Sequence, residues 1–186
     1  MSTEEPSAPA TRRRDPERRS RIIDAALLVI ARDGVAGASM RRIADQADVP
    51  LGSMTYHFRD REDLLAEAFG RFIDELDRLT TARIDAVKTP AKMLDLVADL
   101  IFDPDDRHYR LLSYELWAYA SRRPEMKPLA ARGIQIVRRG LLRFFEKPVA
   151  DAINALLDGA YIHRAYEESL SPRKDFRAML GRIAGL

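Results

Sequence analysis

The sequence contains no cysteine among its 186 residues. This absence excludes disulfide bonds, thiolate zinc sites and cysteine nucleophiles, and it is typical of proteins from a reducing compartment. No apolar run approaches the roughly 18 residues that a membrane-spanning helix needs. The N-terminal stretch lacks the apolar region of a secretory signal. We therefore expect a cytoplasmic protein that does not engage a membrane.

Signatures of the common enzyme classes are also missing. The sequence has three histidines, and none has the spacing of an HExxH metal site. It has no G-x-S-x-G elbow, no P-loop and no G-x-G-x-x-G stretch. We expect no catalytic residue, no metal site and no cofactor. Two weaker alternatives stay open, which are a helical small-molecule enzyme and an acidic ligand or metal bound by His108 and His163.

Proline and glycine divide the chain into about nine segments of helical periodicity, and no segment alternates like a strand. The sequence predicts an all-α fold with helices over residues 16–34, 39–47, 50–58, 61 to at least 76, 90–102, 104–121, 129–145, 148–168 and from 172 onward. We expect a disordered arm over residues 1–15, a helix-turn-helix domain over 16–60 and a C-terminal domain over 61–186. Arg12, Arg13 and Arg14 in the arm either enter a DNA minor groove or form a solubilising tail.

Residues 39–58, SMRRIADQADVPLGSMTYHF, have the pattern of two short helices joined by a tight turn. Ala44 is small enough for close helix approach. The shared core of the two helices is predicted to contain Ile43, Ala47, Val49, Met54 and Phe58. The opposite face of the second helix carries short or hydrogen-bonding groups, which suit phosphates and base edges in a major groove. The excess of positive charge also lies in this part, since residues 1–61 hold 11 Lys and Arg against 9 Asp and Glu.

Four stretches together resemble the TetR family of bacterial repressors: RSRIIDAALLVIARDG, RRIADQADV, GSMTYHF and RDREDLLAEAF. They cover residues 18–69 almost without interruption. The resemblance implies a homodimeric transcriptional regulator, most often a repressor, which binds a palindromic double-stranded DNA operator and responds to an unknown small-molecule effector. A regulator of the same fold with a pocket filled by side chains, and hence no effector, is the alternative.

The resemblance also assigns DNA-contact roles by position. The residues that match contact positions of the family are Ser39, Arg41, Gly52, Ser53, Thr55, Tyr56, His57 and Arg61. Among these, Ser39 matches a helix cap and phosphate contact, and Arg61 matches a residue that anchors the next helix to a phosphate. For Tyr56 a core position and for His57 a structural role are the alternatives.

Two residues depart from the family pattern. Asp48 stands where the turn usually has glycine, and Asp tolerates the left-handed conformation better than most residues. Leu51 stands where relatives often place a polar contact residue. It either touches a thymine methyl or packs on Met54, and packing is the preferred interpretation.

The C-terminal part has no signature of similar specificity. Its aromatic residues are dense around 102–119, and with two earlier phenylalanines they predict a pocket for an apolar, aromatic-containing effector, although each alone is equally a core residue. The predicted pocket residues are Phe69, Phe72, Phe102, Tyr109, Tyr114 and Trp117. Two long helices carry more apolar surface than one core layer needs, so we expect them to pair in a four-helix dimer bundle. The predicted interface residues are Ile136, Val137, Gly140, Ile153, Leu156, Leu157 and Ala160.

Overall fold

The structure is a computed structural model that describes residues 16–103, 107–166 and 171–186. All regular elements in these ranges are helical, which confirms the predicted fold class and the number of helices. They are α1 (Pro16–Gly37), α2 (Met40–Ala47), α3 (Leu51–His57), α4 (Arg61–Asp85), α5 (Pro90–Phe102), α6 (Arg107–Ser121), the 3-10 turn η2 (Pro124–Met126), α7 (Lys127–Leu141), α8 (Lys147–Tyr166) and α9 (Arg173–Ala184). The predicted arm, with Arg12, Arg13 and Arg14, lies outside the described residues. No described helix is long and apolar enough to cross a membrane.

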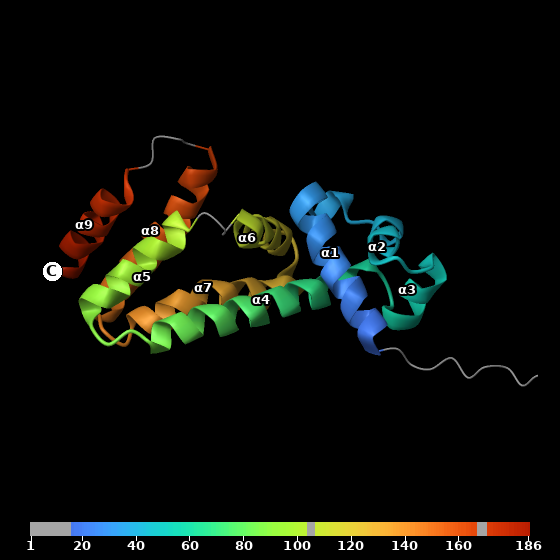
Figure 1. The fold of residues 1–186 in the computed structure, drawn as a ribbon, viewed down its shortest axis with the longest axis horizontal. Helices are drawn as coiled ribbons and strands as arrows, with labels where there is room; N and C mark the ends of the chain where they lie inside the picture. The colour runs from blue at the N-terminus through green and yellow to red at the C-terminus, as the bar shows by residue number, and fades with distance from the viewer. Residues whose placement is uncertain (1–15, 104–106, 167–170) are drawn as a thin grey trace, which may run out of the picture.

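The molecule is elongated, with α1, α2 and α3 forming a head at one end and α5, α8 and α9 at the other (Figure 1). Helix α4 leaves the head and runs the length of the body, with α7 packed along it. One core cluster joins the head to the first half of α4 and to α6. A second cluster joins α5, α8 and α9 to the ends of α4 and α7. Since α4 takes part in both clusters, it is the rigid connection between the head and the far end.

Local capping explains where the helices of the head begin and end. The hydroxyl of Ser39 accepts a hydrogen bond from the Arg42 backbone N–H (3.3 Å) at the start of α2. Asp60 caps α4 in the same way, and its carboxylate accepts from the Asp63 N–H at 2.7 Å. Gly34 interrupts α1 with φ 73° and ψ 171°, a conformation that only glycine adopts readily. Each of these three boundaries was predicted from the sequence.

Several boundaries differ from the prediction by a few residues, and two of them have a clear local cause. Pro50 lies just before α3 as its N-cap, in extended conformation, and is not its first helical residue. Helix α7 ends at Leu141 and does not continue to Phe145. There the N–H groups of Phe144 and Phe145 both donate to the Leu141 carbonyl, each at 3.0 Å, so the chain turns toward α8.

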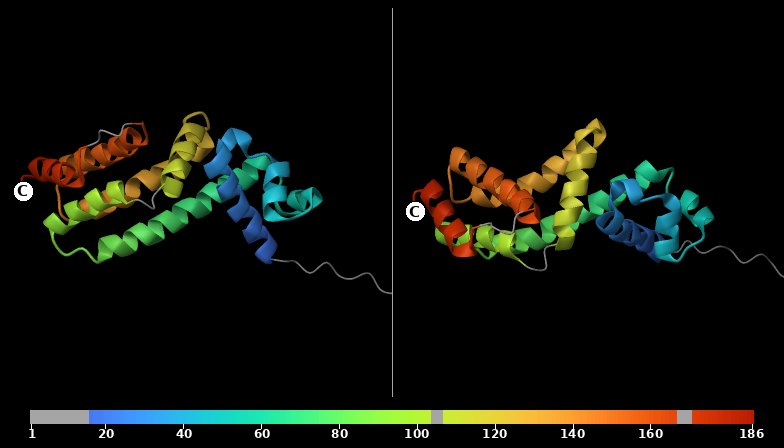
Figure 2. Two further views of the ribbon diagram at one scale, coloured as in Figure 1. Left: turned by 45° about the horizontal axis from the view of Figure 1, so that its top comes forward. Right: turned by 90° about the horizontal axis from the view of Figure 1, so that it is seen from above.

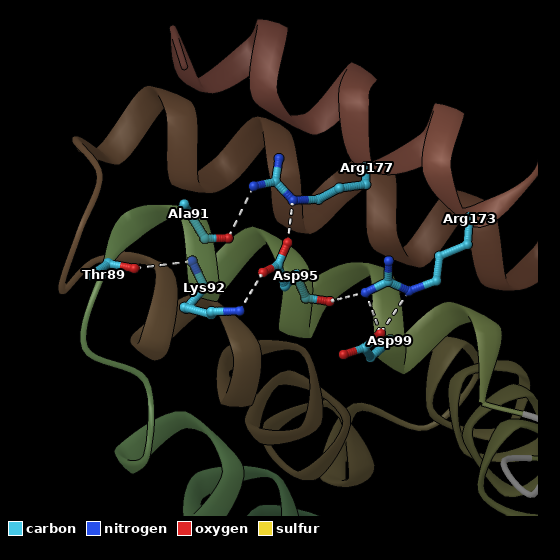
Figure 3. Close-up of polar contacts among 7 residues, drawn as sticks. All are labelled: Thr89, Ala91, Lys92, Asp95, Asp99, Arg173 and Arg177. Carbon is cyan, nitrogen blue, oxygen red and sulfur yellow. Dashed lines mark hydrogen bonds and ion pairs between the residues drawn. The ribbon is translucent and has the colours of Figure 1, made fainter.

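Two arginines of α9 hold that helix against α5 (Figure 3). Arg177 donates to the Asp95 carboxylate (2.7 Å) and to the Ala91 carbonyl (3.1 Å). Arg173 donates to the Asp99 carboxylate (2.7 Å) and to the Asp95 carbonyl (3.4 Å). The hydrogen bond from Arg177 keeps the pKa of Asp95 below its usual range. These contacts fix which side of α9 faces the core and which side faces outward.

Candidate DNA-binding surface and ligand cavity

Helices α2 and α3 form the predicted helix-turn-helix, and the turn between them depends on Asp48. Asp48 has φ 52° and ψ 52°, the left-handed conformation that the sequence required of it. Its N–H closes the end of α2 by donating to the carbonyls of Ala44 and Asp45. Met54 and Phe58 are fully buried against the head core and so fix the orientation of α3. The opposite face of α3 is therefore directed away from the protein.

The outer face of α3 is exposed along its length. Tyr56 has 69% of its surface exposed, which excludes the alternative that it fills the core. Thr55 is exposed, and its hydroxyl donates to the Gly52 carbonyl (3.2 Å). Nothing lies within 4 Å of the position that a Cβ on Gly52 would take, so the backbone there is open to a partner. Leu51 is 49% exposed, so about half of its side chain is open to a partner.

The remaining predicted contact residues surround this face. Arg41 is exposed on α2, and Ser39 is exposed although its hydroxyl already caps that helix. Ser53 and His57 are half-buried. The ring of His57 meets that of Tyr56 edge-on, with centroids 5.1 Å apart. Tyr56 and His57 thus support each other at the end of α3.

Arg61 is turned into the protein, which revises the role expected for it. Its Nε donates to the Ala38 carbonyl at 2.8 Å, and its Nη2 donates to the Val35 carbonyl. These carbonyls belong to the last turn of α1 and to the residue that follows it. The guanidinium is therefore engaged in holding the end of α1 against the start of α4, and the sequence pattern could not separate this role from a phosphate contact.

A cavity of about 520 Å³ lies in the body between α4, α6, α7 and α8. This volume is in the range of small-molecule sites, and it argues against the alternative of a pocket filled by side chains. Three of the predicted pocket residues, Tyr109, Tyr114 and Trp117, line it. The other three do not. Phe69 and Phe72 are buried in the first core cluster, and Phe102 packs on Phe176 with ring centroids 6.0 Å apart.

The cavity also contains polar groups that the sequence analysis missed. Asn154 and Asp158 lie one turn apart on α8 and both line it. Asn154 is 5% exposed, and its Oδ1 is buried without a hydrogen-bond partner. Burial raises the pKa of Asp158 to about 6. The signal available in the sequence was the pair of polar residues, four apart, within a largely apolar helix.

Two of the three tyrosines that line the cavity use their hydroxyls within the protein. Tyr114 donates to the Tyr161 carbonyl, and Tyr161 donates to the Leu100 carbonyl at 3.1 Å. At one edge Arg83 and Asp103 form an ion pair of 3.9 Å. These bonds tie α6 to α8 and α8 to α5, so the aromatic walls are held in place and present mainly their ring surfaces to the cavity.

Helix α6 links this cavity to the head. It carries cavity residues on both sides of Glu115, and the Glu115 carboxylate accepts a hydrogen bond of 2.7 Å from the Val35 N–H. A Cβ on Gly34 would lie 3.1 Å from the same carboxylate. Figure 2 shows α6 standing between α1 and the rest of the body. Sequence reasoning had no signal for this contact, because the two partners are 80 positions apart.

The predicted dimer residues of α7 and α8 are mostly used inside the protomer. Ile136, Ile153, Leu157 and Ala160 are each less than 5% exposed. Gly140 is buried against α4, where a Cβ would lie 2.9 Å from Ile84. Val137 and Leu156 are half-buried, and three of the seven (Ile136, Val137 and Leu157) line the cavity. These faces therefore form the wall of the cavity and the protomer core.

The described residues contain no group of three or more histidine or acidic side chains that could hold a metal ion. His108 and His163 are both exposed. The arrangement consists of an exposed helix face, a cavity and a helix that connects them.

Comparison with known proteins gives the same picture. Residues 22–68 match the family model of bacterial regulatory proteins of the tetR family. Residues 88–186 match that of the tetracyclin repressor-like C-terminal domain. The crystal structure of SCO7518 from Streptomyces coelicolor A3(2) superposes with a TM-score of 0.82 and 36% identity, over 92% of this chain and 100% of that one.

Two further relatives have names that describe a ligand or a response. The multidrug binding protein EbrR, in complex with malachite green, has a TM-score of 0.74 and 32% identity over 92% of this chain and 100% of that one. The nicotine-responsive transcriptional repressor HdnoR of Paenarthrobacter nicotinovorans is 25% identical over 86% of this chain and 89% of its own length. These relatives are regulators and binding proteins, in agreement with the expectation that the chain is not an enzyme. With family models covering the head and the body, the chain belongs to the TetR family of helix-turn-helix transcriptional regulators.

Proposed function

We propose that this regulator is a ligand-responsive repressor that binds a palindromic operator as a homodimer. The observation that carries the proposal is the combination of an exposed α3 face and a body cavity, with α6 lining the cavity and contacting α1 of the head. The names of HdnoR and EbrR support it, since one is a responsive repressor and the other binds small molecules.

The outer face of α3 would enter the major groove. Tyr56 would donate from its hydroxyl to a phosphate, and Thr55 and Gly52 would approach base edges or the sugar-phosphate backbone. The exposed Leu51 would contact a thymine methyl, which is the alternative that its exposure now favours. Arg41 on α2 would lie near the flanking phosphates. Arg61 is left out of this contact set because its guanidinium is engaged with backbone carbonyls.

The dimer would form through the outward side of α8 and α9. Five large apolar side chains are exposed there, and we call them the α8–α9 face: Ile162, Tyr166, Met179, Ile183 and Leu186, with exposed fractions of 47%, 83%, 37%, 37% and 66%. Exposed large apolar side chains gathered on two neighbouring helices are typical of a protein interface. It lies at the end of the body far from α3 (Figure 1). Pairing there would leave both heads free for two half-sites.

Ligand response would pass through α6. A molecule in the cavity contacts the same helix whose Glu115 binds the last turn of α1. If the cavity accepts the ligand in only one position of α6, the position of the head changes with occupancy. The ligand must bind the two arrangements with different affinity for this to shift DNA binding.

The test is footprinting of the purified protein on the DNA upstream of its own gene and on genomic fragments, at two salt concentrations. We expect protection of a palindrome that weakens with salt, because phosphate contacts release counterions. Tyr56→Phe and Leu51→Ala should each weaken protection several-fold. Leu28→Ala is the matched control, because Leu28 is an equally exposed leucine on α1 outside the α3 face. If a genome-wide selection yields no specific fragment, the proposal is wrong.

A further inference from the structure

We propose that the cavity is a site for an organic amine, bound as its ammonium cation by Asp158 and Asn154 against aromatic walls. This inference rests on the proposed function, because it names the class of effector that the regulator would sense. It depends on which polar groups of the cavity are still available to a ligand.

Most polar groups of the cavity already have partners within the protein. The hydroxyls of Tyr114 and Tyr161 donate to backbone carbonyls, and the Ser113 hydroxyl donates to the Tyr109 carbonyl at 3.0 Å. Arg83 is paired with Asp103 at 3.9 Å. Arg110 is also engaged by other groups of the chain, although its Nη1 is buried without a hydrogen-bond partner. Both arginines therefore already have an interaction within the protein.

Asp158 and Asn154 are different. No hydrogen bond or ion pair of Asp158 occurs among the described residues, and the Asn154 Oδ1 is buried without a partner. A desolvated carboxylate without a counter-charge and an acceptor without a donor are both costly. Residues four apart on a helix have Cβ atoms about 6 Å apart, so one ammonium group can reach both. An ammonium supplies the missing charge and the missing N–H donor together.

The rest of the cavity suits the body of such a molecule. The rings of Tyr114 and Trp117 lie with centroids 6.0 Å apart and interplanar angle 53°, and Tyr109 and Tyr161 lie on neighbouring walls. Aromatic faces attract cations as well as apolar groups. Leu76, Leu79 and Ile134 add aliphatic surface. The geometry points to an amine on an aromatic or apolar body that fits about 520 Å³.

Binding should depend on pH, because only the ionised carboxylate attracts the cation. The charged and titratable groups that line the cavity with Asp158 are Arg83, Asp103, Arg110, Tyr109, Tyr114 and Tyr161. Burial raises the pKa of Asp158 itself to about 6. An amine with a pKa well above 8 stays charged between pH 5 and pH 7.5. Its affinity should therefore fall roughly ten-fold from pH 7.5 to pH 5.

The experiment uses matched probes on phenyl, naphthyl and diphenyl bodies. Each body carries one of four groups: a primary ammonium on a methylene (methylammonium), a trimethylammonium, a hydroxymethyl or a carboxylate. Binding is measured by calorimetry and by the rise in melting temperature of the protein. We expect the methylammonium probes to bind at least ten-fold more tightly than the matched alcohols. Asp158→Asn should remove this preference, whereas Asp103→Asn, which alters the other cavity carboxylate, should preserve it. Asn154→Ala should weaken the methylammonium probes and leave the trimethylammonium probes unchanged.

Either of two results would overturn the inference. One is that alcohols or carboxylates bind as tightly as the ammonium probes on every body, and the other is that Asp158→Asn binds ammonium probes like the wild type. Operator binding without any probe is measured in parallel, because it reports on the proposed function alone. Intact operator binding without ammonium preference rejects the ligand class only, while loss of specific DNA binding in the wild type rejects the proposed function.

Discussion

Arg59 and Arg61 stand two positions apart, yet the fold uses them differently. Arg59 has 84% of its side chain exposed and pairs with Asp63 at 2.9 Å, a contact between neighbouring turns of the chain. Arg61 has 26% of its side chain exposed and binds the carbonyls of Val35 and Ala38, which lie on the other side of the head. The role of a basic residue here depends on the direction of its side chain, which the pattern of the sequence does not contain.

We expect Arg61→Ala to destabilise the protein, because two backbone carbonyls lose charge-assisted hydrogen bonds. A hydrogen bond to a charged group contributes at most about 1.5–3 kcal/mol. Because the freed carbonyls can bind water in the variant, we expect the free energy of unfolding to fall by about 2 kcal/mol in total. Urea denaturation followed by circular dichroism measures it. Arg59→Ala is the control and should leave stability nearly unchanged. A phosphate contact by Arg61 would give the opposite result, with unchanged stability and a reduced salt dependence of DNA binding.

Asp158 should cost the protein stability when its site is empty. Burial raises the pKa of Asp158 from 3.8 to about 6, so the folded state holds the proton more tightly than the unfolded state. This loss of stability is absent below the pKa that Asp158 has in the unfolded state. It develops as the pH rises from about 4 to 6 and is complete above the pKa of the folded state. The full rise corresponds to roughly 3 kcal/mol, and partial exposure of the side chain reduces this to about 1–2 kcal/mol.

Asp158→Asn should therefore be more stable than the wild type at pH 8 by about 1–2 kcal/mol, and the difference should vanish near pH 4. Urea denaturation at pH 4, 6 and 8 gives the comparison. If the variant is less stable than the wild type at pH 8, the carboxylate has a favourable partner in the cavity, and the prediction is wrong. Residues that serve ligand binding often lower the folding stability of the free protein.

Helix boundaries and helix faces were not equally predictable. The caps at Ser39 and Asp60 and the break at Gly34 follow from local chemistry, and the sequence placed them correctly. The orientation of α8 did not follow. Ile153 and Leu157 point inward, and the apolar positions left exposed or half-exposed include Ala152, Ala155, Gly159, Ile162 and Tyr166. Both faces of α8 are largely apolar, so periodicity alone cannot tell the core from a surface that awaits a partner.

The same limit applies to the cavity. Aromatic density in the sequence identified Tyr109, Tyr114 and Trp117 but also Phe69 and Phe72, since the composition of a cavity wall resembles that of a core. What separates them is the packing of α4, α6, α7 and α8, which leaves a space beside one group and fills it beside the other. That outcome depends on long-range contacts that local patterns do not encode.

Helix α6 should stiffen the last turn of α1 through Glu115. We expect Glu115→Ala to speed hydrogen exchange of the backbone amides around Val35 by roughly ten-fold, because the Val35 N–H loses its acceptor. Exchange measured by mass spectrometry or NMR on the free protein needs no ligand. Glu125→Ala, which alters an exposed glutamate in η2, is the control and should leave these amides unchanged. Equal exchange in both variants would show that α6 does not restrain the head through this contact.

The arrangement of the whole molecule places α3 at one end and the helix pair α8 and α9 toward the other (Figure 1). The protomer core of this end is complete without the exposed side chains, because Ile153, Leu157, Phe176 and Leu180 already fill it. The clamp of Arg173 and Arg177 on α5 keeps Met179 and Ile183 directed outward. Ala152, Ala155 and Gly159 beside Ile162 would let a second copy of α8 approach closely.

Ile162→Glu combined with Ile183→Glu should convert the proposed dimer into a folded monomer. Both side chains are exposed in the protomer, so a glutamate at either position should leave the folded protomer stable. The charge destabilises only an interface that buries it. Sedimentation velocity at micromolar concentration measures the mass, and circular dichroism confirms the helical content. Leu28→Glu on α1 is the control and should leave the mass unchanged. Operator affinity of the double variant should fall by a hundred-fold or more, since two linked heads bind one palindrome far more tightly than one. A double variant that still sediments as a dimer would move the interface away from α8 and α9.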